Sequence, residues 1–226
     1  MSNICLIPAR GGSKRIPRKN IKPFEGKPMI AWSIEAAKAS GLFSRIIVST
    51  DDPDIATTAR DYGAETPFMR PPEIADDHAT TVDVVRHALD GLGTDIEALC
   101  CLYATAPFVR ATDIQAARLL LTGEKVFSMP VTTFPFPIQR AVAITPDGGL
   151  QMFNPKEAQT RSQDLNEAYH DVGQFYWGTP DAWRSDIPIF GPKTAPLIIP
   201  RWRAQDIDTT EDWTRAEALF RAIKDS

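Results

Sequence analysis

Short apolar runs alternate along the chain with longer segments in which apolar residues recur at intervals of three or four. The short runs, each of the length of a β-strand, lie at residues 4–8, 46–49, 96–103, 126–131, 174–177 and 196–199. Such alternation is typical of a parallel sheet covered by helices. The pattern therefore predicts an α/β fold in which helices flank a mostly parallel sheet.

Proline and glycine mark the ends of the first predicted helices. Pro28 opens a periodic segment that ends at Gly41, and Pro53 opens a shorter segment that stops at Gly63. Proline suits the first turn of a helix, and glycine suits the position just past its last turn. Both segments are predicted helices, and residues 66–68 are predicted to form a brief strand after the second.

Three further helices follow from spacing and capping residues. The first has one apolar face, formed by Val82, Val85, Leu89 and Leu92. Thr112 is expected to cap the next helix. The last helix begins near Thr209, because Thr209 and Asp212 resemble a capping box and an apolar stripe follows them.

The pattern changes at residue 132. From residue 134 the sequence reads FPFPIQRAVAITPDGGLQMF. Two extended runs flank the turn-forming residues 146–149, which predicts a β-hairpin. We interpret residues 132–169 as an arm inserted into a single domain of residues 1–226. A hairpin has exposed edges that need cover, so we expect a dimerisation arm that packs on a second subunit. The alternative is a hairpin that folds back on its own domain.

Composition limits the classes of protein to consider. The 226 residues, 43% of them hydrophobic, suffice for one full core. A net charge of −4 argues against nucleic acid as a partner, because duplex binding needs a broad basic face. No apolar stretch approaches the ~18 residues of a membrane span, and no basic segment precedes the first apolar run. We expect a soluble, cytoplasmic protein that binds no membrane.

Three cysteines, Cys5, Cys100 and Cys101, lie in apolar strand-like runs without C-x-x-C spacing. This arrangement indicates neither a zinc site nor a disulfide framework. We predict that all three pack in the core, where cysteine behaves as a small hydrophobic residue.

A strongly basic loop follows the first apolar run. Residues 8–22, PARGGSKRIPRKNIK, carry Arg10, Lys14, Arg15, Arg18, Lys19 and Lys22. The other 19 of the 25 basic residues face 29 acidic ones, so this positive loop sits on an acidic protein. Glycine allows the backbone N–H groups of Gly11, Gly12 and Ser13 to line one concavity, and the cations can neutralise phosphate. The loop is predicted to bind a polyphosphate, with a solvated basic loop as the alternative.

The spacing of this loop matches neither the P-loop nor the dinucleotide fingerprint, so both of those classes lose support. A nucleoside triphosphate would also need a divalent cation, and Mg²⁺ prefers one or two carboxylates together with phosphate oxygens and water. Candidate carboxylate pairs are Asp51 with Asp52, Asp76 with Asp77, and Asp206 with Asp208.

Asp206 and Asp208 are the favoured metal ligands. They stand two residues apart, so in an extended segment both side chains point to one side. Helix capping for Asp208 and solvation for Asp206 remain the alternatives. Asp51 and Asp52 lie between a strand and a helix, where aspartate is common as a cap.

Several stretches resemble one family. IPARGGSKRIPRKNIKPFEGKPMIAWSIEAA is similar to the opening of the nonulosonic (sialic) acid cytidylyltransferases, the family of CMP-N-acetylneuraminate synthetases. The resemblance continues through STDDPDIATTARDYGAE, RPPEIADDHATT, YATAPF and QDIDTTEDW, and it covers nearly the whole chain. RSQDL followed by YHDVGQFYW resembles the pseudaminic acid cytidylyltransferases more than the neuraminic acid enzymes.

The resemblance implies a Rossmann-like nucleotide-diphosphosugar transferase fold, a β-hairpin dimerisation arm and a homodimer. It also implies an enzyme that uses Mg²⁺ and converts CTP and a nine-carbon ulosonic acid into a CMP-sugar and pyrophosphate. Pseudaminic acid is the first expectation for the acid, and N-acetylneuraminic, legionaminic and ketodeoxyoctonic acids are the alternatives. A nucleotide-binding module without activity is the alternative from another class.

Matching positions carry the family's roles onto this sequence. The triphosphate and ribose would contact Arg10, Gly11, Gly12, Ser13, Lys19 and Asn20. Lys19 would neutralise the departing pyrophosphate, and the cytosine would lie against Arg70, Asp77 and Thr80. Asp206 and Asp208 match the Mg²⁺ carboxylates, and together with Arg10 and Lys19 they form the expected catalytic group.

The resemblance also suggests residues for the sugar. The candidates are Tyr103, Arg161, His170, Gln174 and Tyr176, with Arg161 assigned to the sugar carboxylate. Tyr103 stands where the neuraminic acid enzymes usually have glutamine, so the sugar contacts of that strand differ here. In the expected reaction the anomeric hydroxyl attacks the α-phosphorus in line, and no side chain in the sequence is identified as the base.

Overall fold

The computed structural model describes residues 2–76 and 79–224 of the chain. The strands are β1 Ser2–Pro8, β2 Pro23–Phe24, β3 Lys27–Pro28, β4 Phe43–Ser49, β5 Ile96–Leu102, β6 Phe127–Thr133, β7 Val142–Ile144, β8 Leu150–Met152, β9 Tyr169–Asp171, β10 Phe175–Gly178 and β11 Thr194–Ile198. The helices are α1 Met29–Ser40, α2 Pro53–Asp61, α3 Thr81–Leu92, α4 Ala111–Leu119, α5 Pro180–Arg184 and α6 Thr210–Lys224.

The central sheet has the strand order β11-β6-β10-β5-β1-β4, and β9 pairs with β6 outside this path. β1 is parallel to β4 and β5, and β11 is parallel to β6. The predicted α/β fold with a mostly parallel sheet is therefore confirmed. β10, however, runs antiparallel to both β5 and β6. The chain leaves β6 at its carboxyl end and returns through β9 at the same edge, so β10 must run in the opposite direction.

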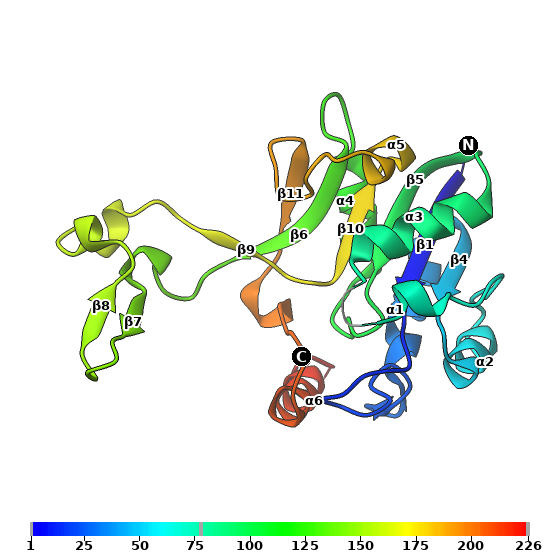
Figure 1. Ribbon diagram of the computed structural model, residues 1–226, viewed down its shortest axis with the longest axis horizontal. Coiled ribbons are helices and arrows are strands. Elements are labelled where there is room, and N and C mark those ends of the chain that lie inside the picture. Colours follow the sequence, from blue (N-terminus) through cyan, green and yellow to red (C-terminus); the bar gives the residue numbers. More distant parts are fainter. Residues whose placement is uncertain (1, 77–78, 225–226) are drawn as a thin grey trace.

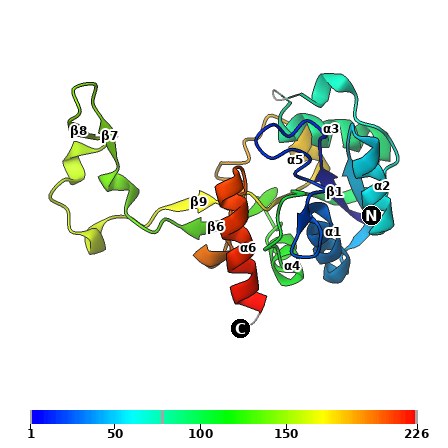
Figure 2. The same cartoon turned by 90° about the horizontal axis from the view of Figure 1, so that it is seen from below.

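Helices cover both faces of the sheet, as Figures 1 and 2 show. Alternate residues of β1 face the two layers: Cys5 and Ile7 pack in the cluster with α1, α2 and α4, whereas Ile4 and Leu6 pack in the cluster with α3 and α5. This two-residue period is the geometry of a strand buried on both faces. The cysteines are free and buried, which confirms their predicted packing role.

The C-terminal helix α6 packs against the amino-terminal part of the chain, where a third apolar cluster forms. Trp213 meets the ring of Phe24 edge-on with centroids 5.4 Å apart. The predicted capping box is present: the backbone N–H of Thr209 donates to the Asp212 carboxylate at 2.9 Å, and the N–H of Asp212 donates to the Thr209 hydroxyl at 3.2 Å. Ile207, just before the helix, is buried in the same cluster.

Two local predictions are wrong. α4 begins at Ala111 after Arg110, with no side-chain cap, so Thr112 lies inside the first turn. Residues 66–68 form no strand, and only isolated bridges from Glu65 and Met69 reach the sheet edge. Pro67 lies between those two bridges and has no N–H to donate to a ladder.

Residues 134–168 project from the sheet between β6 and β9 as an extended arm (Figure 1). Its outer part is the predicted hairpin: β7 and β8 pair antiparallel, and the N–H of Thr145 donates to the Gly149 carbonyl at 2.9 Å. In both ribbon views the hairpin points away from the sheet rather than folding back on it (Figures 1 and 2).

Within residues 2–76 and 79–224, no helix is both long enough and apolar enough to cross a bilayer.

The packing of α6 generates a prediction about stability. Trp213→Ala should lower the free energy of unfolding by about 3–5 kcal/mol, because it empties a ring-sized space in a cluster where Trp213 is only 4% exposed. Denaturant-induced unfolding measures this loss. Trp202→Ala is the matched control: Trp202 is 40% exposed and should cost clearly less than Trp213→Ala. Equal losses for the two variants would contradict the assigned packing.

Candidate active site

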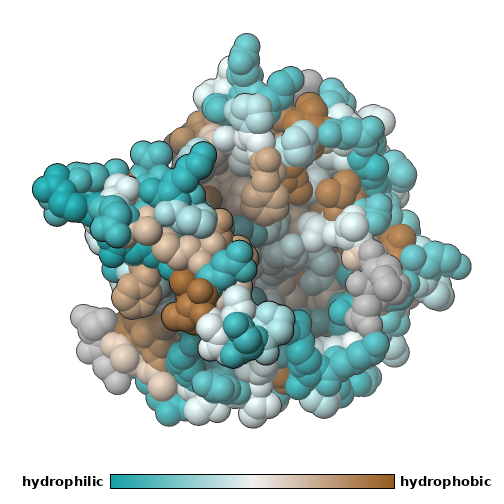
Figure 3. All heavy atoms as spheres, turned by 60° about the vertical axis from the view of Figure 1, so that its left-hand side comes forward, coloured by the Kyte–Doolittle hydropathy of each residue, from teal (hydrophilic) through white to brown (hydrophobic). Residues whose placement is uncertain are grey.

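A cavity of about 450 Å³ opens at the carboxyl edge of β1 and β5. It is lined by the loop after β1, by residues 103–105 after β5 and by residues 79–81 at the start of α3. In open α/β sheets, ligands bind beyond the carboxyl ends of the parallel strands. Figure 3, which brings the arm side forward, shows the surface hollowed next to the arm.

The basic loop is held in shape by its own polar contacts. Buried Asn20 donates from its side-chain amide to the Arg10 carbonyl at 2.9 Å, and the N–H of Gly11 donates to the Asp51 carboxylate at 2.9 Å. A Cβ at Gly11 would lie 2.8 Å from a carboxylate oxygen of Asp52, which is too close. A larger residue at position 11 would therefore force the Asp52 side chain to shift.

Asp52 and its neighbours serve the loop and helix α2. The Asp52 carboxylate accepts hydrogen bonds from the N–H groups of Asp54 and Ile55, at 2.8 and 3.1 Å, and so caps α2. Arg18, with φ of 55°, reaches across to Asp54 at 2.9 Å and to Asp52 at 3.5 Å. The capping alternative is thus the observed role of Asp52.

The basic loop meets the C-terminal acidic segment at Asp208. The Lys19 ammonium lies 3.1 Å from one Asp208 carboxylate oxygen, and the Arg15 guanidinium lies 2.7 Å from the other. Lys19 also donates to the Ile207 carbonyl at 2.8 Å. Lys19 and Asp208 are 189 positions apart in the sequence, yet both line the same cavity.

A second cavity of about 390 Å³ adjoins the first. The two share Lys19, Tyr103, Thr105 and Asp208, and the second is completed by Asp171, Val172, Gly173, Tyr176 and Asp206. Two compartments that meet at a lysine and an aspartate can hold two reactants side by side. The shared residues mark the place where groups from the two reactants would come together.

Charge and burial shift several pKa values around these cavities. Partial burial raises the pKa of Asp206, and the negative charge of Asp208 raises it further, whereas Lys19 opposes the shift. Arg70 is 6% exposed, and burial lowers its pKa while the charge of Asp51 counteracts this effect. The Arg70 guanidinium donates to the hydroxyl of Ser49 at 3.1 Å and to the Ser49 carbonyl, so it is held rigidly in the cavity wall.

Two tyrosines line the second cavity, and one of them, Tyr103, also lines the first. The Tyr103 hydroxyl lies 2.8 Å from the Thr81 hydroxyl, and the Tyr176 hydroxyl donates to the Asp171 carboxylate. The two rings meet edge-on with centroids 5.7 Å apart. Burial is the main cause that raises the pKa of both phenols, so both hydroxyls keep their protons at neutral pH.

The structure brings most of the residues predicted for the nucleotide and the metal to these cavities. The first cavity contains Arg10, Ser13, Lys19, Asn20, Arg70, Thr80, Tyr103 and Asp208. Asp206 and Tyr176 join Tyr103, Lys19 and Asp208 in the second. Gly11 and Gly12 shape the loop and are not among the residues that line either cavity. Asp77 lies outside the described residues.

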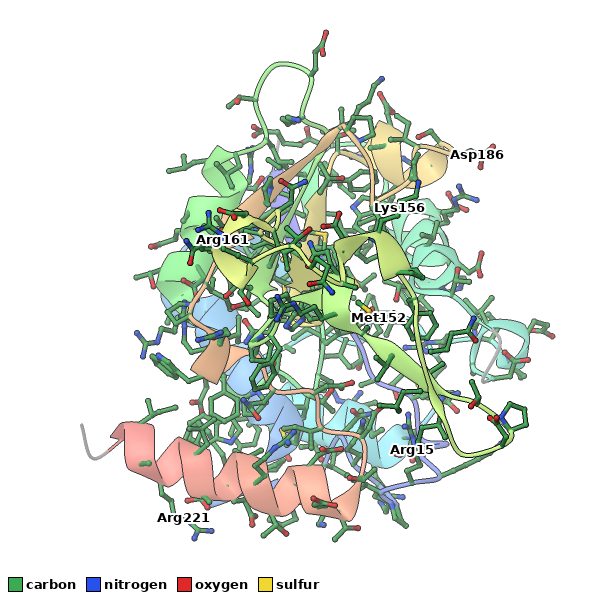
Figure 4. The ribbon with its side chains drawn as sticks, turned by 90° about the vertical axis from the view of Figure 1, so that its left-hand side faces the viewer. Arg15, Met152, Lys156, Arg161, Asp186 and Arg221 are labelled. Carbon is green, nitrogen blue, oxygen red and sulfur yellow. The ribbon has the colours of Figure 1, made fainter. Side chains whose placement is uncertain are left out.

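Three residues predicted for the sugar lie elsewhere in the chain. Arg161 is exposed on the arm and pairs with Asp164 at 2.7 Å, and Figure 4 shows it well away from Arg15. Gln174 is buried and donates to the Arg203 carbonyl at 2.7 Å. Neither side chain is among the residues that line the two cavities described above, so the structure shows no direct contact of either with a ligand there.

His170 is the third. Its ring packs against Phe134 with centroids 4.8 Å apart, and its Nδ1 lies 2.8 Å from the Asp171 carbonyl. Asp171, one residue later, lines the second cavity instead. Neighbouring side chains of a strand point to opposite faces, and β9 was not predicted as a strand. Had residues 169–171 been recognised as a strand, Asp171 would have become a candidate for the sugar site.

Among the described residues, no group of three or more histidine, cysteine or acidic side chains is arranged to hold a metal ion. Asp206 and Asp208 nevertheless place two carboxylates on the second cavity, and Asp208 also borders the first. Two carboxylates suffice for Mg²⁺ only where a ligand supplies phosphate oxygens.

Comparison with known proteins finds close relatives. The sequence profile of a family described as cytidylyltransferase matches residues 4–142. A pseudaminic acid cytidylyltransferase of Campylobacter jejuni (strain 81-176) is 43% identical over all of this chain and 99% of its own length. An N-acylneuraminate cytidylyltransferase of Escherichia coli O18:K1:H7 is 32% identical over 94% of this chain and 51% of its own.

A solved structure shares the fold. The CTP complex of CMP:2-keto-3-deoxy-manno-octonic acid synthetase superposes with a TM-score of 0.72, over 99% of this chain and 100% of its own, at 18% identity. At that identity the likeness concerns the fold alone, and it agrees with the expected nucleotide-diphosphosugar transferase architecture.

The raised pKa of Asp206 yields a prediction about pH and stability. Because the folded state favours the protonated carboxyl, the charged form destabilises the fold above the ordinary aspartate pKa of about 4. Asp206→Asn should therefore raise the melting temperature at pH 7 in EDTA, and the difference should vanish below about pH 4. Asp186→Asn is the control: Asp186 is fully exposed and its 3.5 Å ion pair with Arg86 contributes little, so the melting temperature should change little at either pH. A lower melting temperature of Asp206→Asn at pH 7 would contradict this sign.

Proposed function

This chain belongs to the cytidylyltransferase family, a family of nucleotidyltransferases, and from that membership we propose that it couples CTP to a nonulosonic acid. The products are a CMP-sugar and pyrophosphate. Pseudaminic acid is the proposed substrate, because the 43% identical relative is named for it. The observation that carries the proposal is the junction of two cavities at Lys19 and Asp208.

CTP occupies the larger cavity in this proposal. Arg10, Ser13, Lys14, Arg15 and Lys19 line one wall and match the charge and hydrogen-bonding needs of a triphosphate. Arg70 and Thr80, which line the same cavity, would then face the cytosine. Arg70 suits this role because its contacts with Ser49 restrict it to one orientation before the nucleotide binds.

The sugar acid occupies the second cavity, with its anomeric hydroxyl at the junction. There the hydroxyl can attack the α-phosphorus in line while the pyrophosphate leaves toward the basic loop. Little covalent chemistry is asked of the protein, so positioning and fixed charge provide the acceleration. Lys19 is placed to neutralise the charge that develops on the pyrophosphate.

The same proposal assigns Mg²⁺ to Asp206 and Asp208. The donor set fits, because the two carboxylates face a cavity in which phosphate oxygens complete the shell. When bound, Mg²⁺ would neutralise triphosphate charge. In the structure, Lys19 and Arg15 pair with Asp208. Both side chains also line the first cavity, so each could turn from Asp208 to a phosphate group of CTP.

A homodimer formed through the arm is also part of the proposal. The arm carries large apolar side chains that are at least 74% exposed, namely Phe136, Ile144, Leu150 and Phe153. Exposed apolar surface of this kind marks an interaction site, and a second copy of the chain is the expected cover. Arg161 lies on this arm, so its proposed contact with the sugar carboxylate depends on the dimer.

His170 and Gln174 act indirectly on the sugar in this scheme. The backbone carbonyl of Gln174 accepts a hydrogen bond from the N–H of Tyr103 at 2.8 Å, and the ring of His170 lies beside the backbone of Asp171. Both therefore position residues that line the second cavity.

A cytoplasmic location belongs to the same proposal, since the three free cysteines fit a reducing compartment.

A substrate panel tests the function. With CTP and Mg²⁺, the protein should release pyrophosphate, with the highest kcat/KM for pseudaminic acid among pseudaminic, neuraminic, legionaminic and ketodeoxyoctonic acids. Asp208→Asn and Lys19→Ala should each lower kcat by about 10²–10³-fold, because each removes one preorganised charge at the junction. Asp186→Asn serves as the control and should keep full activity.

The outcomes of this panel are distinct. Silence with every acid would reject the proposed reaction, and tight CTP binding without turnover would favour a nucleotide-binding module. Faster turnover of another acid would keep the reaction and change the substrate. Unchanged turnover of Asp208→Asn would overturn the metal assignment.

The arm gives a second test. Ile144 and Leu150 are cross-strand partners in the hairpin, and both are exposed. Replacing both with glutamate should convert a dimer into a single chain in sedimentation equilibrium at micromolar concentration, since buried unpaired charge is unfavourable. Leu119→Glu, at an exposed leucine of α4, should leave the dimer intact. A monomeric wild-type protein, or a double variant that stays dimeric, would contradict the arm's role.

A further inference from the structure

Asp171, the last residue of β9, is a charged side chain in the second cavity to which the sequence analysis assigned no role. We propose that Asp171 determines sugar specificity: its carboxylate accepts a hydrogen bond from a hydroxyl or amide N–H on the part of the sugar acid remote from the anomeric carbon. The inference rests on the proposed function and adds to it the kind of substituent that the site selects.

The carboxylate is fixed before any ligand binds. One oxygen accepts from the N–H of Gly173 at 2.9 Å, and the other accepts from the Tyr176 hydroxyl. The backbone of Asp171 is held at the same time by the pairing of β9 with β6, opposite Val131. Each carboxylate oxygen can accept more than one hydrogen bond, so both retain capacity toward the cavity. A preorganised acceptor discriminates more sharply than a mobile one.

The position of Asp171 relative to the junction decides which part of the sugar it meets. Lys19 and Asp208 border both cavities, whereas Asp171, Gly173 and Tyr176 border only the second. Attack on the nucleotide must take place where the cavities join, which places the anomeric carbon near Lys19. The remainder of the sugar then extends toward Asp171.

Charge makes the orientation selective. The sugar acid carries its own carboxylate at the anomeric carbon, and a carboxylate placed against Asp171 would be repelled. Basic side chains gather at the opposite side, in the loop that lines the first cavity. At the junction Lys19 counters the charge of Asp208 and Asp206, whereas the hydrogen bonds described for Asp171 come from neutral donors. Asp171 therefore disfavours the reversed orientation and favours hydrogen-bond donors in the correct one.

Neighbouring groups fit an accepting role for Asp171. Burial raises the pKa of Tyr176, so its hydroxyl keeps its proton and donates a hydrogen bond to Asp171. Tyr176 therefore does not compete with Asp171 as an acceptor for a donor group of the substrate. Tyr103, edge-on to Tyr176, is itself tied to Thr81. Among these groups Asp171 is the one that bears a negative charge.

Asp171→Asn is the direct test, because it keeps the shape and removes the charge. The expected result is a 10- to 100-fold lower kcat/KM for the sugar acid, mostly through KM, since a hydrogen bond to a charged acceptor is lost. The KM for CTP and the melting temperature should stay unchanged. Asp186→Asn is the matched control. Should the asparagine variant fold poorly, Asp171→Ser offers a second variant that can still accept from the N–H of Gly173.

Substrate analogues separate a direct contact from a structural effect. Each analogue lacks one hydroxyl or N-acyl group. For one of them, kcat/KM with wild-type protein should be at least 10-fold lower than for the full sugar acid, whereas Asp171→Asn should use that analogue and the full sugar acid equally well. Equal losses for every analogue, or an unchanged sugar KM in the variant, would overturn the inference while leaving the reaction established. If wild-type protein turns over no acid at all, the proposed function fails first, and this inference fails with it.

Discussion

The contact between Lys19 and Asp208 is the interaction on which the rest of the site depends. It joins a basic loop at one end of the chain to an acidic segment at the other, with 3.1 Å between ammonium and carboxylate. A partly buried ion pair of this kind gains little stability by itself, because desolvation offsets attraction. Its importance is positional: it sets the wall that both cavities share.

The fold around this pair holds two loop segments in place. The loop is pinned through Gly11 and Asn20, and the acidic segment is anchored by buried Ile207 and by the capping box of α6. The aromatic contacts between Phe24 and Trp213 tie the two anchors together. Neither half of the site can move far without disturbing a packed cluster.

The second cavity differs from the first in its chemistry. The first is lined by cations that suit phosphate, whereas the second combines the phenols of buried Tyr176 and half-buried Tyr103 with Asp171 and the pair Asp206 and Asp208. In the proposed function the nucleotide would thus be recognised mainly by charge, and the sugar acid by directed hydrogen bonds. This division explains how related sites can share one nucleotide and accept different sugars, since a few polar contacts decide the second choice.

The sequence by itself determined the α/β class, most element positions, the basic loop, the acidic pair and the hairpin, because each depends on local periodicity, turn chemistry or short spacing. The tertiary structure alone decided that β10 runs antiparallel, that His170 faces Phe134 while Asp171 faces the second cavity, and that Arg161 is not among the residues that line the two cavities of the site. These features depend on where the chain returns to the sheet after a long insertion. One residue of strand register reverses which side chain points inward, and no local pattern encodes that register.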